Sequence, residues 1–457
     1  MLKFTQEEIA EITGGKLLSD KNGIEIRNFS IDSRTVKDKD FFIAVKGSNF
    51  DGHDFVLDAI KKGASGLMVE RFTWEHLPQG VDCVIIVDDA RRAMGRIAGE
   101  IRKRSSAKIV AITGTNGKTT VKDILSYILS FGYKVLRSKK SYNNIIGLSL
   151  TLFDLEEEDD IAVLELGTNH PGEIAALAKI ANPDIALITN IGSGHLEHFG
   201  SREGVLTEKV SLLDFLPEGG LALLNRDDSL LAATGGRSGT GKFYGTHPGC
   251  DFRISSIMKK ERGYEFLFNG ERFFLPLEGI HNVYNASSAL AVAMCLGMET
   301  GIMREALRGV TLPEMRLERI NMNGITFIND SYNANPDSFE CALEVLKETI
   351  SPRRGVIAGE MMELGGATDE LHRTVGRSIA VKGIDFVISL GEMSRGILRG
   401  ALEYGMDERN TYFAKDHEDA ARMLQRLAGA KAAVLLKGSR KTKMEEVLKC
   451  FTTCCTH

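Results

Sequence analysis

This sequence of 457 residues contains no long hydrophobic run. Its apolar stretches fall short of the roughly 18 residues that a membrane-spanning helix needs, so we expect no membrane span. It also lacks a basic excess, since the formal net charge is −5, whereas nucleic-acid-binding proteins usually carry a surplus of lysine and arginine. The composition therefore supports neither a membrane protein nor a partner made of nucleic acid.

Cysteine is sparse, and its seven residues are scattered along the chain, which argues against a disulfide framework. The N-terminus does not resemble a signal peptide, because Glu7, Glu8 and Glu11 interrupt it. We therefore expect the protein to be cytoplasmic. The tail Cys450–His457 contains metal-binding residue types, but no second ligand pair lies near it in sequence, so we favour a frayed terminus.

The length predicts about three domains, and 43% hydrophobic and 26% charged residues indicate an ordinary globular protein. Apolar strands alternating with helical patterns predict the α/β class. We expect a small α/β domain over 1–104, a central doubly wound domain over 105–313 and a Rossmann-like domain over 314–457. Apolar or alternating runs predict strands at 24–31, 41–45, 66–69, 83–87, 109–113, 161–166, 185–189, 221–224, 325–329, 354–358, 384–390 and 432–436.

The most informative stretch is Ile109–Phe131. It begins with a continuous apolar run, typical of a buried parallel strand, and ends with apolar residues at helical spacing. Between them lies Gly114–Thr120, whose glycines let backbone N–H groups converge on an anion at a helix N-terminus. In such a loop Lys118 reaches the β- and γ-phosphates of a nucleotide, and the hydroxyl of Thr119 reaches Mg²⁺.

This loop departs from the general phosphate-loop pattern at one position. The pattern requires a further glycine where this chain has Ile112. A Gly-Lys-Thr sequence alone would also fit a polar turn before a surface helix. The apolar strand before the loop and the amphipathic helix after it favour nucleotide binding.

Further polar residues follow predicted strands of the central segment. Glu165 ends one strand, and Thr189–His198 follows the next. Because the carboxyl ends of parallel strands form the ligand-binding edge of such sheets, a carboxylate there is placed to hold Mg²⁺. Taken singly, Glu165 also fits a surface carboxylate, and His195 a structural histidine. Asn282 and Asn285 precede an Ala-rich helix, where they would contact an adenine or cap the helix.

The outer segments repeat this arrangement. Asp32-Ser33-Arg34 follows a strand in the first segment, and Asn329–Pro336, Gly359–Gly365 and Lys437–Arg440 follow strands in the last. The last segment lacks Gly-x-Gly-x-x-Gly, so a dinucleotide site is not indicated. One ATP-binding domain between two domains with polar edges predicts a reaction between two substrates in a cleft.

These motifs, in this order, resemble the Mur ligase family of peptidoglycan synthesis. The family's ATP signature matches Thr113–Thr120, including the missing glycine, and the resemblance covers essentially the whole chain. Within the family, Glu165–Ile174, Asp330–Ser338 and Gly359–Gly365 resemble the members that add the dipeptide D-alanyl-D-alanine to a UDP-N-acetylmuramoyl-tripeptide. The Asp-Asn-Pro-Arg motif of members that add the third residue is absent.

The resemblance implies roles for individual residues. ATP would contact Gly114, Thr115, Asn116, Gly117, Lys118, Thr119, Thr120, His281, Asn282, Asn285, Arg316 and Asp330. The implied magnesium ligands are Thr119, Glu165, His195 and Lys209, the last as a carbamate. The implied substrate-facing residues are Ser33, Arg34, Asn143, Asn144, His170, Asn333 and Asn335. The implied catalytic residues are Lys118, His195, Lys209 and Arg316.

The implied reaction is an ATP-dependent amide ligation through an acyl phosphate, with ATP and two Mg²⁺ ions as cofactors, by a protein that we expect to be a monomer. The nearest alternatives are a family member that adds a diamino acid and a folylpolyglutamate synthetase. An alternative of another class is a P-loop ATPase or switch whose outer domains bind a macromolecule. The sequence leaves open whether the third residue of the tripeptide is lysine or diaminopimelate.

Overall fold

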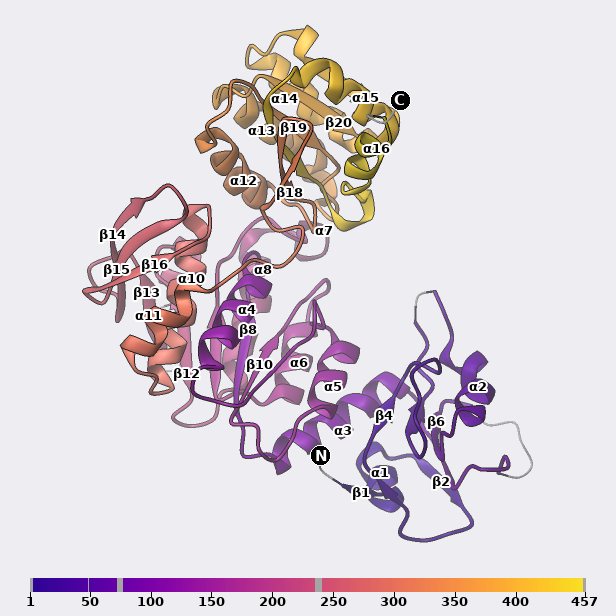
Figure 1. The fold of residues 1–457 in the computed structure, drawn as a ribbon. Coiled ribbons are helices and arrows are strands. Elements are labelled where there is room, and N and C mark those ends of the chain that lie inside the picture. Colours follow the sequence, from indigo (N-terminus) through magenta and orange to yellow (C-terminus); the bar gives the residue numbers. More distant parts are fainter. Residues whose placement is uncertain (1–2, 48, 72–76, 235–240, 455–457) are drawn as a thin grey trace.

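The computed structural model describes residues 3–47, 49–71, 77–234 and 241–454. Its N-terminal, central and C-terminal parts follow one another along a curved, elongated molecule, with the C-terminal part at the top of Figure 1. Predominantly parallel sheets covered by helices confirm the predicted α/β class. The frayed terminus expected over Cys450–His457 is wrong for residues 450–454, because they belong to helix α16 (Glu446–Cys454) and Phe451 is buried in the core. Residues 455–457 lie outside this description.

The N-terminal part is built on a five-stranded sheet of order β2-β7-β6-β5-β4, in which only β2 runs antiparallel to its neighbour. These strands are β2 (Lys16–Ser19), β4 (Phe29–Ser30), β5 (Phe41–Ile43), β6 (Gly66–Val69) and β7 (Cys83–Ile86). A small antiparallel pair is formed by β1 (Phe4–Thr5) and β3 (Glu25–Ile26). The helices are α1 (Gln6–Thr13), α2 (Val56–Lys61) and α3 (Ala90–Arg104).

The single strand predicted over 24–31 is wrong. This stretch contains β3 and β4, which belong to different sheets: β3 pairs with β1, and β4 pairs with β5. The exposed residues Arg27 and Asn28 separate them. A run of suitable residues predicts extended backbone, but it does not reveal the strand with which each half pairs.

The central part contains a nine-stranded sheet of order β16-β15-β14-β13-β12-β11-β8-β10-β9. The four strands that were predicted, β8, β10, β11 and β12, are parallel as expected. Strands β9, β13 and β14 extend this parallel part and were not predicted, and neither was the antiparallel extension from β14 to β16. The strands are β8 (Lys108–Thr113), β9 (Val135–Arg137), β10 (Ile161–Glu165), β11 (Ile185–Ile188), β12 (Leu221–Asn225), β13 (Gly241–Gly245), β14 (Phe252–Lys259), β15 (Tyr264–Phe268) and β16 (Glu271–Leu275). The helices are α4 (Lys118–Leu129), α5 (Ile145–Phe153), α6 (Glu173–Ala181), α7 (Leu196–Phe199), α8 (Arg202–Val210), α9 (Ser229–Ala233), α10 (Ile280–Cys295) and α11 (Thr300–Arg308).

Strand β8 shows why its sequence is apolar without alternation. Ile109 and Ala111 belong to the core shared with α5 and α6, whereas Val110 and Ile112 belong to the core shared with α4, α10 and α11. Because helices cover both faces of the sheet, side chains pointing either way are buried.

The C-terminal part contains a six-stranded sheet of order β17-β18-β22-β19-β20-β21, parallel except for β17. The strands are β17 (Glu318–Met322), β18 (Ile325–Asp330), β19 (Arg354–Ala358), β20 (Phe386–Leu390), β21 (Thr411–Ala414) and β22 (Ala432–Lys437). The helices are α12 (Pro336–Glu348), α13 (Thr368–Val381), α14 (Arg395–Glu403), α15 (His417–Ala428) and α16 (Glu446–Cys454). The carboxyl ends of β18, β19 and β22 lie at one edge, as the sequence predicts.

Helix α3 joins the first two parts by packing against α5 and α6 (Figure 1). Its Met94 and Ile97 share one core with Leu148 and Leu152 of α5. The joint is apolar, so separating these parts would expose buried surface. Among the described helices, none is both long and apolar enough to cross a membrane.

Candidate active site

The phosphate loop connects β8 to α4, and Lys118 is the first residue of that helix. Gly114 has a φ of 146°, and a Cβ atom there would lie 1.9 Å from the hydroxyl oxygen of Thr189. Gly117 has a φ of 85°, and its Cβ would lie 2.4 Å from the side-chain oxygen of Asn285. Both positions therefore require glycine, for the backbone conformation and for space.

The missing glycine of the general pattern has a structural explanation. Its position is held by Ile112, a fully buried residue of β8. The strand continues to Thr113, so the turn begins only at Gly114. The loop is shorter than the general pattern because this position still belongs to the core.

The segment after β11 holds the phosphate loop in shape. The backbone N–H of Asn116 donates to Oδ1 of Asn190 at 2.9 Å, and Nδ2 of Asn190 donates back to the carbonyl oxygen of Asn116 at 3.0 Å. Oγ1 of Thr189 donates to the same carbonyl at 2.6 Å, and the N–H of Gly192 donates to Oγ1 of Thr115 at 2.8 Å. The conformation of the loop therefore depends on a neighbouring strand end as well as on its own glycines.

Lys118 lies within the phosphate loop, where its neighbours only partly offset its positive charge. Its Nζ donates to the carbonyl oxygens of Gly114 and Thr115, at 2.9 and 3.1 Å. Burial lowers the pKa of Lys118 and the nearby Arg316 lowers it further, while Glu165 opposes both effects. A partly buried ammonium on neutral carbonyls is costly, and a bound phosphate would supply the opposite charge.

Glu165, at the end of β10, joins residues from three segments. It is 1% exposed. Its Oε2 accepts a hydrogen bond from Oγ1 of Thr119 at 2.8 Å, and its Oε1 accepts one from Nδ2 of Asn143 at 2.9 Å. Arg316, which precedes β17, donates through Nη2 to Oγ1 of Thr119 at 3.0 Å. Residues predicted to contact Mg²⁺, the γ-phosphate and a substrate therefore meet beside the phosphate loop.

Lys209 is a buried amine in α8, with an exposed fraction of 2%. Burial lowers the pKa of Lys209 well below its usual value, the charge of Lys118 lowers it further, and Glu208 opposes them. No described residue forms a hydrogen bond or an ion pair with this amine. Such a lysine is deprotonated more readily than an exposed one, so it is more nucleophilic.

The neighbouring Glu208 supports a substrate-side loop. Its carboxylate accepts hydrogen bonds from the N–H groups of Gly172 and Ile174, at 2.7 and 2.8 Å, and from Oγ1 of Thr168 at 3.1 Å. These bonds hold the start of α6 and the segment that contains His170. Sequence reasoning did not assign this role, because only the fold brings α8 next to the start of α6.

His195 contacts the C-terminal part. It has a φ of 59°, and its Nδ1 forms an ion pair with Glu363, which lies between β19 and α13. The close approach of the His195 ring lowers the pKa of Glu363 despite burial. Within the described residues, no three or more His, Cys, Asp or Glu side chains form a group suited to a metal ion. Glu165 and His195 therefore do not make a complete metal site by themselves.

The start of α10 presents an ordered amide pair. Nδ2 of Asn282 donates to the carbonyl oxygen of Glu278 at 2.7 Å, and its Oδ1 accepts from Nδ2 of Asn285 at 3.0 Å. Gly279 is the N-cap, so neither asparagine caps the helix as one alternative proposed. Burial lowers the pKa of His281 to about 4, so its ring is neutral at pH 7.

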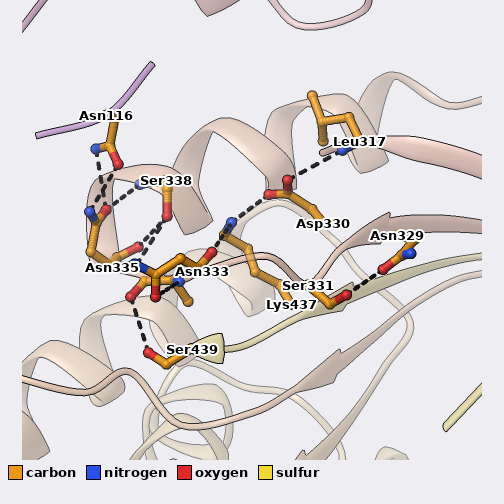
Figure 2. A network of polar contacts seen from close by, with 11 residues as sticks. Asn116, Leu317, Asn329, Asp330, Ser331, Asn333, Asn335, Ser338, Lys437 and Ser439 are labelled. Carbon is orange, nitrogen blue, oxygen red and sulfur yellow. Dashed lines mark hydrogen bonds and ion pairs between the residues drawn. The ribbon is translucent and has the colours of Figure 1, made fainter. Parts of the chain in front are cut away.

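Figure 2 shows the edge of the C-terminal sheet that faces this site. Lys437, at the end of β22, forms an ion pair with Asp330 at the end of β18 and donates to the carbonyl oxygen of Asn333 at 3.1 Å. The other carboxylate oxygen of Asp330 accepts from the N–H of Leu317 at 3.3 Å. The Lys437 side chain is 2% exposed and that of Asp330 is 16% exposed, so replacing Asp330 would leave a buried ammonium without its charged partner, which is strongly destabilising. This lysine positions Asp330, one of the residues predicted to contact ATP.

The same edge contacts the phosphate loop directly. Asn335, the N-cap of α12, and Asn116 exchange two hydrogen bonds between their side-chain amides, at 2.9 and 3.3 Å (Figure 2). The N–H of Ser193 donates to a carboxylate oxygen of Asp337 at 2.6 Å. The C-terminal part therefore contacts both loops of the predicted nucleotide site.

These groups line one cavity of about 1030 Å³, which is at the upper end of the volumes that ligand pockets usually have. Its lining includes most predicted site residues: Thr115, Asn116, Gly117, Lys118, Thr119, Thr120, Asn143, Asn144, Glu165, His195, His281, Asn282, Asn285, Arg316, Asp330, Asn333 and Asn335. The predicted residues outside the lining are Ser33, Arg34, Gly114, His170 and Lys209. Arg34 is instead exposed and paired with Asp32 at 2.7 Å.

Sequence reasoning missed several lining residues. Asp227 and Asp228 follow β12, so the strand-end rule that identified Glu165 applied to them as well. Arg91 extends the lining to the N-terminal part. It lies at the start of α3, and its position depends on how that helix packs against α5, so no local pattern marks it.

Three family models match consecutive parts of the chain. The Mur ligase family catalytic domain matches residues 25–102, the Mur ligase middle domain matches 112–293, and the Mur ligase glutamate ligase domain matches 315–440. Their order is that of the three parts of the structure.

Full-length relatives agree with these matches. The chain is 34% identical to the UDP-N-acetylmuramoyl-tripeptide–D-alanyl-D-alanine ligase of Bacillus subtilis, over 98% of each chain. A crystal structure of MurF from Acinetobacter baumannii superposes with a TM-score of 0.89 at 29% identity, covering 99% of both chains. MurF from Thermotoga maritima in complex with ADP gives a TM-score of 0.82 at 28% identity, covering 93% of this chain and 97% of that one.

Proposed function

The chain belongs to the Mur ligase family, and from this premise we propose that it joins D-alanyl-D-alanine to a UDP-N-acetylmuramoyl-tripeptide at the expense of ATP. The product is the pentapeptide precursor of peptidoglycan, with ADP and phosphate. Similarity over nearly the full length of the Bacillus subtilis ligase supports this specificity. The observation that carries the proposal is the hydrogen bond from Arg316 to Thr119. It lies beside a cavity that extends to Arg91.

Phosphoryl transfer to a carboxylate requires positioning and charge compensation more than covalent chemistry from the protein. A carboxylate oxygen of the tripeptide attacks the γ-phosphorus, and the bond to the β-phosphate oxygen breaks, giving an acyl phosphate and ADP. We propose that the positive charges of Lys118 and Arg316 offset the negative charge of the phosphates in this step. The N–H groups of Gly114–Thr120 bind the phosphates, while His281, Asn282, Asn285 and Asp330 contact the nucleoside.

In the second step the dipeptide amine attacks the acyl carbon. The tetrahedral intermediate then loses phosphate, and the nitrogen loses a proton as the amide forms. Water would hydrolyse the acyl phosphate, so its exclusion matters. We assign this exclusion to the C-terminal part, which contacts the phosphate loop through Asn335 and the loop after β11 through Asp337.

The residues beside the phosphate loop fit Mg²⁺, which we include in the proposal. The hydroxyl of Thr119 and the buried carboxylate of Glu165 are oxygen donors of the kind that Mg²⁺ prefers. Lys209 as an ammonium does not fit, but as a carbamate it would add a carboxylate, and its buried amine with a lowered pKa suits that modification. When bound, Mg²⁺ would neutralise charge on the phosphates. We keep His195 as a further ligand and two ions as the expected number.

We propose that residues 1–104 bind the nucleotide sugar, 105–313 bind ATP and 314–457 complete the site. The assigned substrate contacts are Ser33, Arg34, Asn143, Asn144, His170, Asn333 and Asn335. A monomer in the cytoplasm is part of the same proposal.

A phosphate-release assay on the full chain tests the function. We expect phosphate release only when ATP, the UDP-N-acetylmuramoyl-tripeptide and D-alanyl-D-alanine are all present. Stimulation by a diamino acid instead of the dipeptide would show another member of the family, and stimulation by glutamate with a folate would show a folylpolyglutamate synthetase. Release from ATP alone at the full rate would indicate an ATPase or a switch.

A further inference from the structure

Tyr332 lies where the C-terminal part meets a central loop, the one that contains Ser141. Its hydroxyl forms a hydrogen bond with Oγ of Ser141, in which either oxygen can donate. Its ring lies under the guanidinium of Arg316, with 4.4 Å from the Cζ atom to the ring centroid. Ser141, Arg316 and Tyr332 all line the cavity.

These two contacts complete a circuit of interactions. Arg316 donates to Thr119, Thr119 donates to Glu165, and Glu165 accepts from Asn143, at 3.0, 2.8 and 2.9 Å. The N–H of Asn143 donates to the carbonyl oxygen of Ser141 at 2.8 Å. Because Ser141 is also the hydrogen-bond partner of Tyr332, this bond closes the circuit. The loop assigned to substrate is thus connected to Thr119 on two sides, once through Glu165 and once through Arg316.

We infer that Tyr332 is a positioning residue that couples the placement of the substrate loop to the placement of Arg316. The ring fixes the guanidinium by a cation–π contact, and the planar face leaves the N–H groups free to donate. The hydroxyl makes this position depend on Ser141. A tripeptide that orders the substrate loop would then also order the arginine at the γ-phosphate. This inference rests on the roles proposed for Arg316 and for the loop that contains Asn143.

The chemical change that isolates the coupling is Tyr332→Phe, which keeps the ring and removes the hydroxyl. Ser141→Ala removes the other half of the same hydrogen bond. We expect each variant to lower kcat for tripeptide-dependent phosphate release about five- to ten-fold, as the loss of one positioned hydrogen bond in a partly buried site does. Because both remove one interaction, the double variant should be no slower than the slower single variant.

Three further measurements separate positioning from a general effect on the fold. Binding of ADP and the melting temperature should match the unchanged protein in both single variants, and KM for ATP should change less than kcat. Tyr332→Leu, which also removes the ring, should lower kcat by a further factor of about ten. Tyr142→Phe is the matched control: it is the same change on an exposed neighbour that does not line the cavity, and it should retain full activity.

Two outcomes would overturn the inference. The first is an unchanged kcat in both Tyr332→Phe and Ser141→Ala. The second is a double variant in which the two fold-losses of kcat multiply, which would show that the two substitutions act independently. Arg316→Ala, assayed in parallel, distinguishes this failure from failure of the proposed function. If Arg316→Ala abolishes phosphate release but the tyrosine variants do not lower it, only the coupling is wrong. If Arg316→Ala is fully active, the role proposed for Arg316 is wrong and the coupling fails with it.

Discussion

The nucleotide end of the cavity, which we assign to ATP, and the nucleotide-sugar end, which we assign to the UDP-sugar substrate, differ in how completely the structure assembles them. At the nucleotide end, Lys118, Thr119 and Glu165 are held by short hydrogen bonds from several segments. At the other end, Arg91 lines the cavity from the N-terminal part, whereas the predicted residues Ser33 and Arg34 do not line it. Arg34 forms an exposed ion pair with a carboxylate two positions away.

This difference follows from the origin of the side chains. The nucleotide end is built on the carboxyl ends of neighbouring parallel strands, which the sheet places side by side. The nucleotide-sugar end requires two separate sheets to be oriented by the packing of α3 against α5 and α6. We therefore expect substitutions at the two ends to differ in size and in the substrate whose binding they alter.

The largest effect should come from the phosphate loop. Replacing Lys118 with alanine removes a partly buried positive charge from the position assigned to the phosphates, and we expect kcat/KM to fall by about 10³-fold. Phosphate release under saturating substrates measures this. Lys179→Ala, a change to an exposed lysine of α6, should leave the rate unchanged; near-normal activity of Lys118→Ala would contradict the assigned role.

The next largest effect concerns the buried amine of α8. We expect Lys209→Ala to lower kcat by about 10²-fold, because it removes the group that would become a carboxylate ligand. Short-chain carboxylic acids added to this variant should restore part of the rate, and they should not restore Lys118→Ala. Full activity without added acid would exclude a role for Lys209 as a metal ligand.

A smaller effect should follow from breaking the contact between the C-terminal part and the phosphate loop. Asn335→Ala and Asn116→Ala each remove one of the two paired amides, and we expect kcat to fall about five-fold in either variant. A double-mutant cycle should show that the two losses are not additive. Additive losses would mean that the amide pair does not contribute to turnover.

The smallest effect should appear at the nucleotide-sugar end. Arg34→Ala removes a solvent-exposed charge, so we expect KM for the UDP-N-acetylmuramoyl-tripeptide to rise about three-fold while KM for ATP stays constant. Initial rates at varied concentrations of each substrate measure this. A rise in KM for ATP alone would contradict the division of the cavity into two ends.

Local patterns predicted the elements that carry the nucleotide end. The apolar run before Gly114 became β8, and the residues expected to bind phosphate lie at its end beside Glu165. Such predictions succeed because a buried parallel strand, a glycine turn and a helix N-terminus are each encoded within a few residues. The split of 24–31 into β3 and β4 was not predicted, because strand partners lie far away in the sequence.

The sequence by itself determined the α/β class, the phosphate loop and the set of polar residues at the carboxyl ends of strands. Only the tertiary structure decided that Ile112 completes a strand, that Lys209 is buried without a described partner, and that Tyr332 connects Ser141 to Arg316. The physical reason is that hydrophobic periodicity and turn chemistry act over a few residues. Burial, pKa shifts and contacts between domains depend instead on surfaces that meet only after the chain has folded.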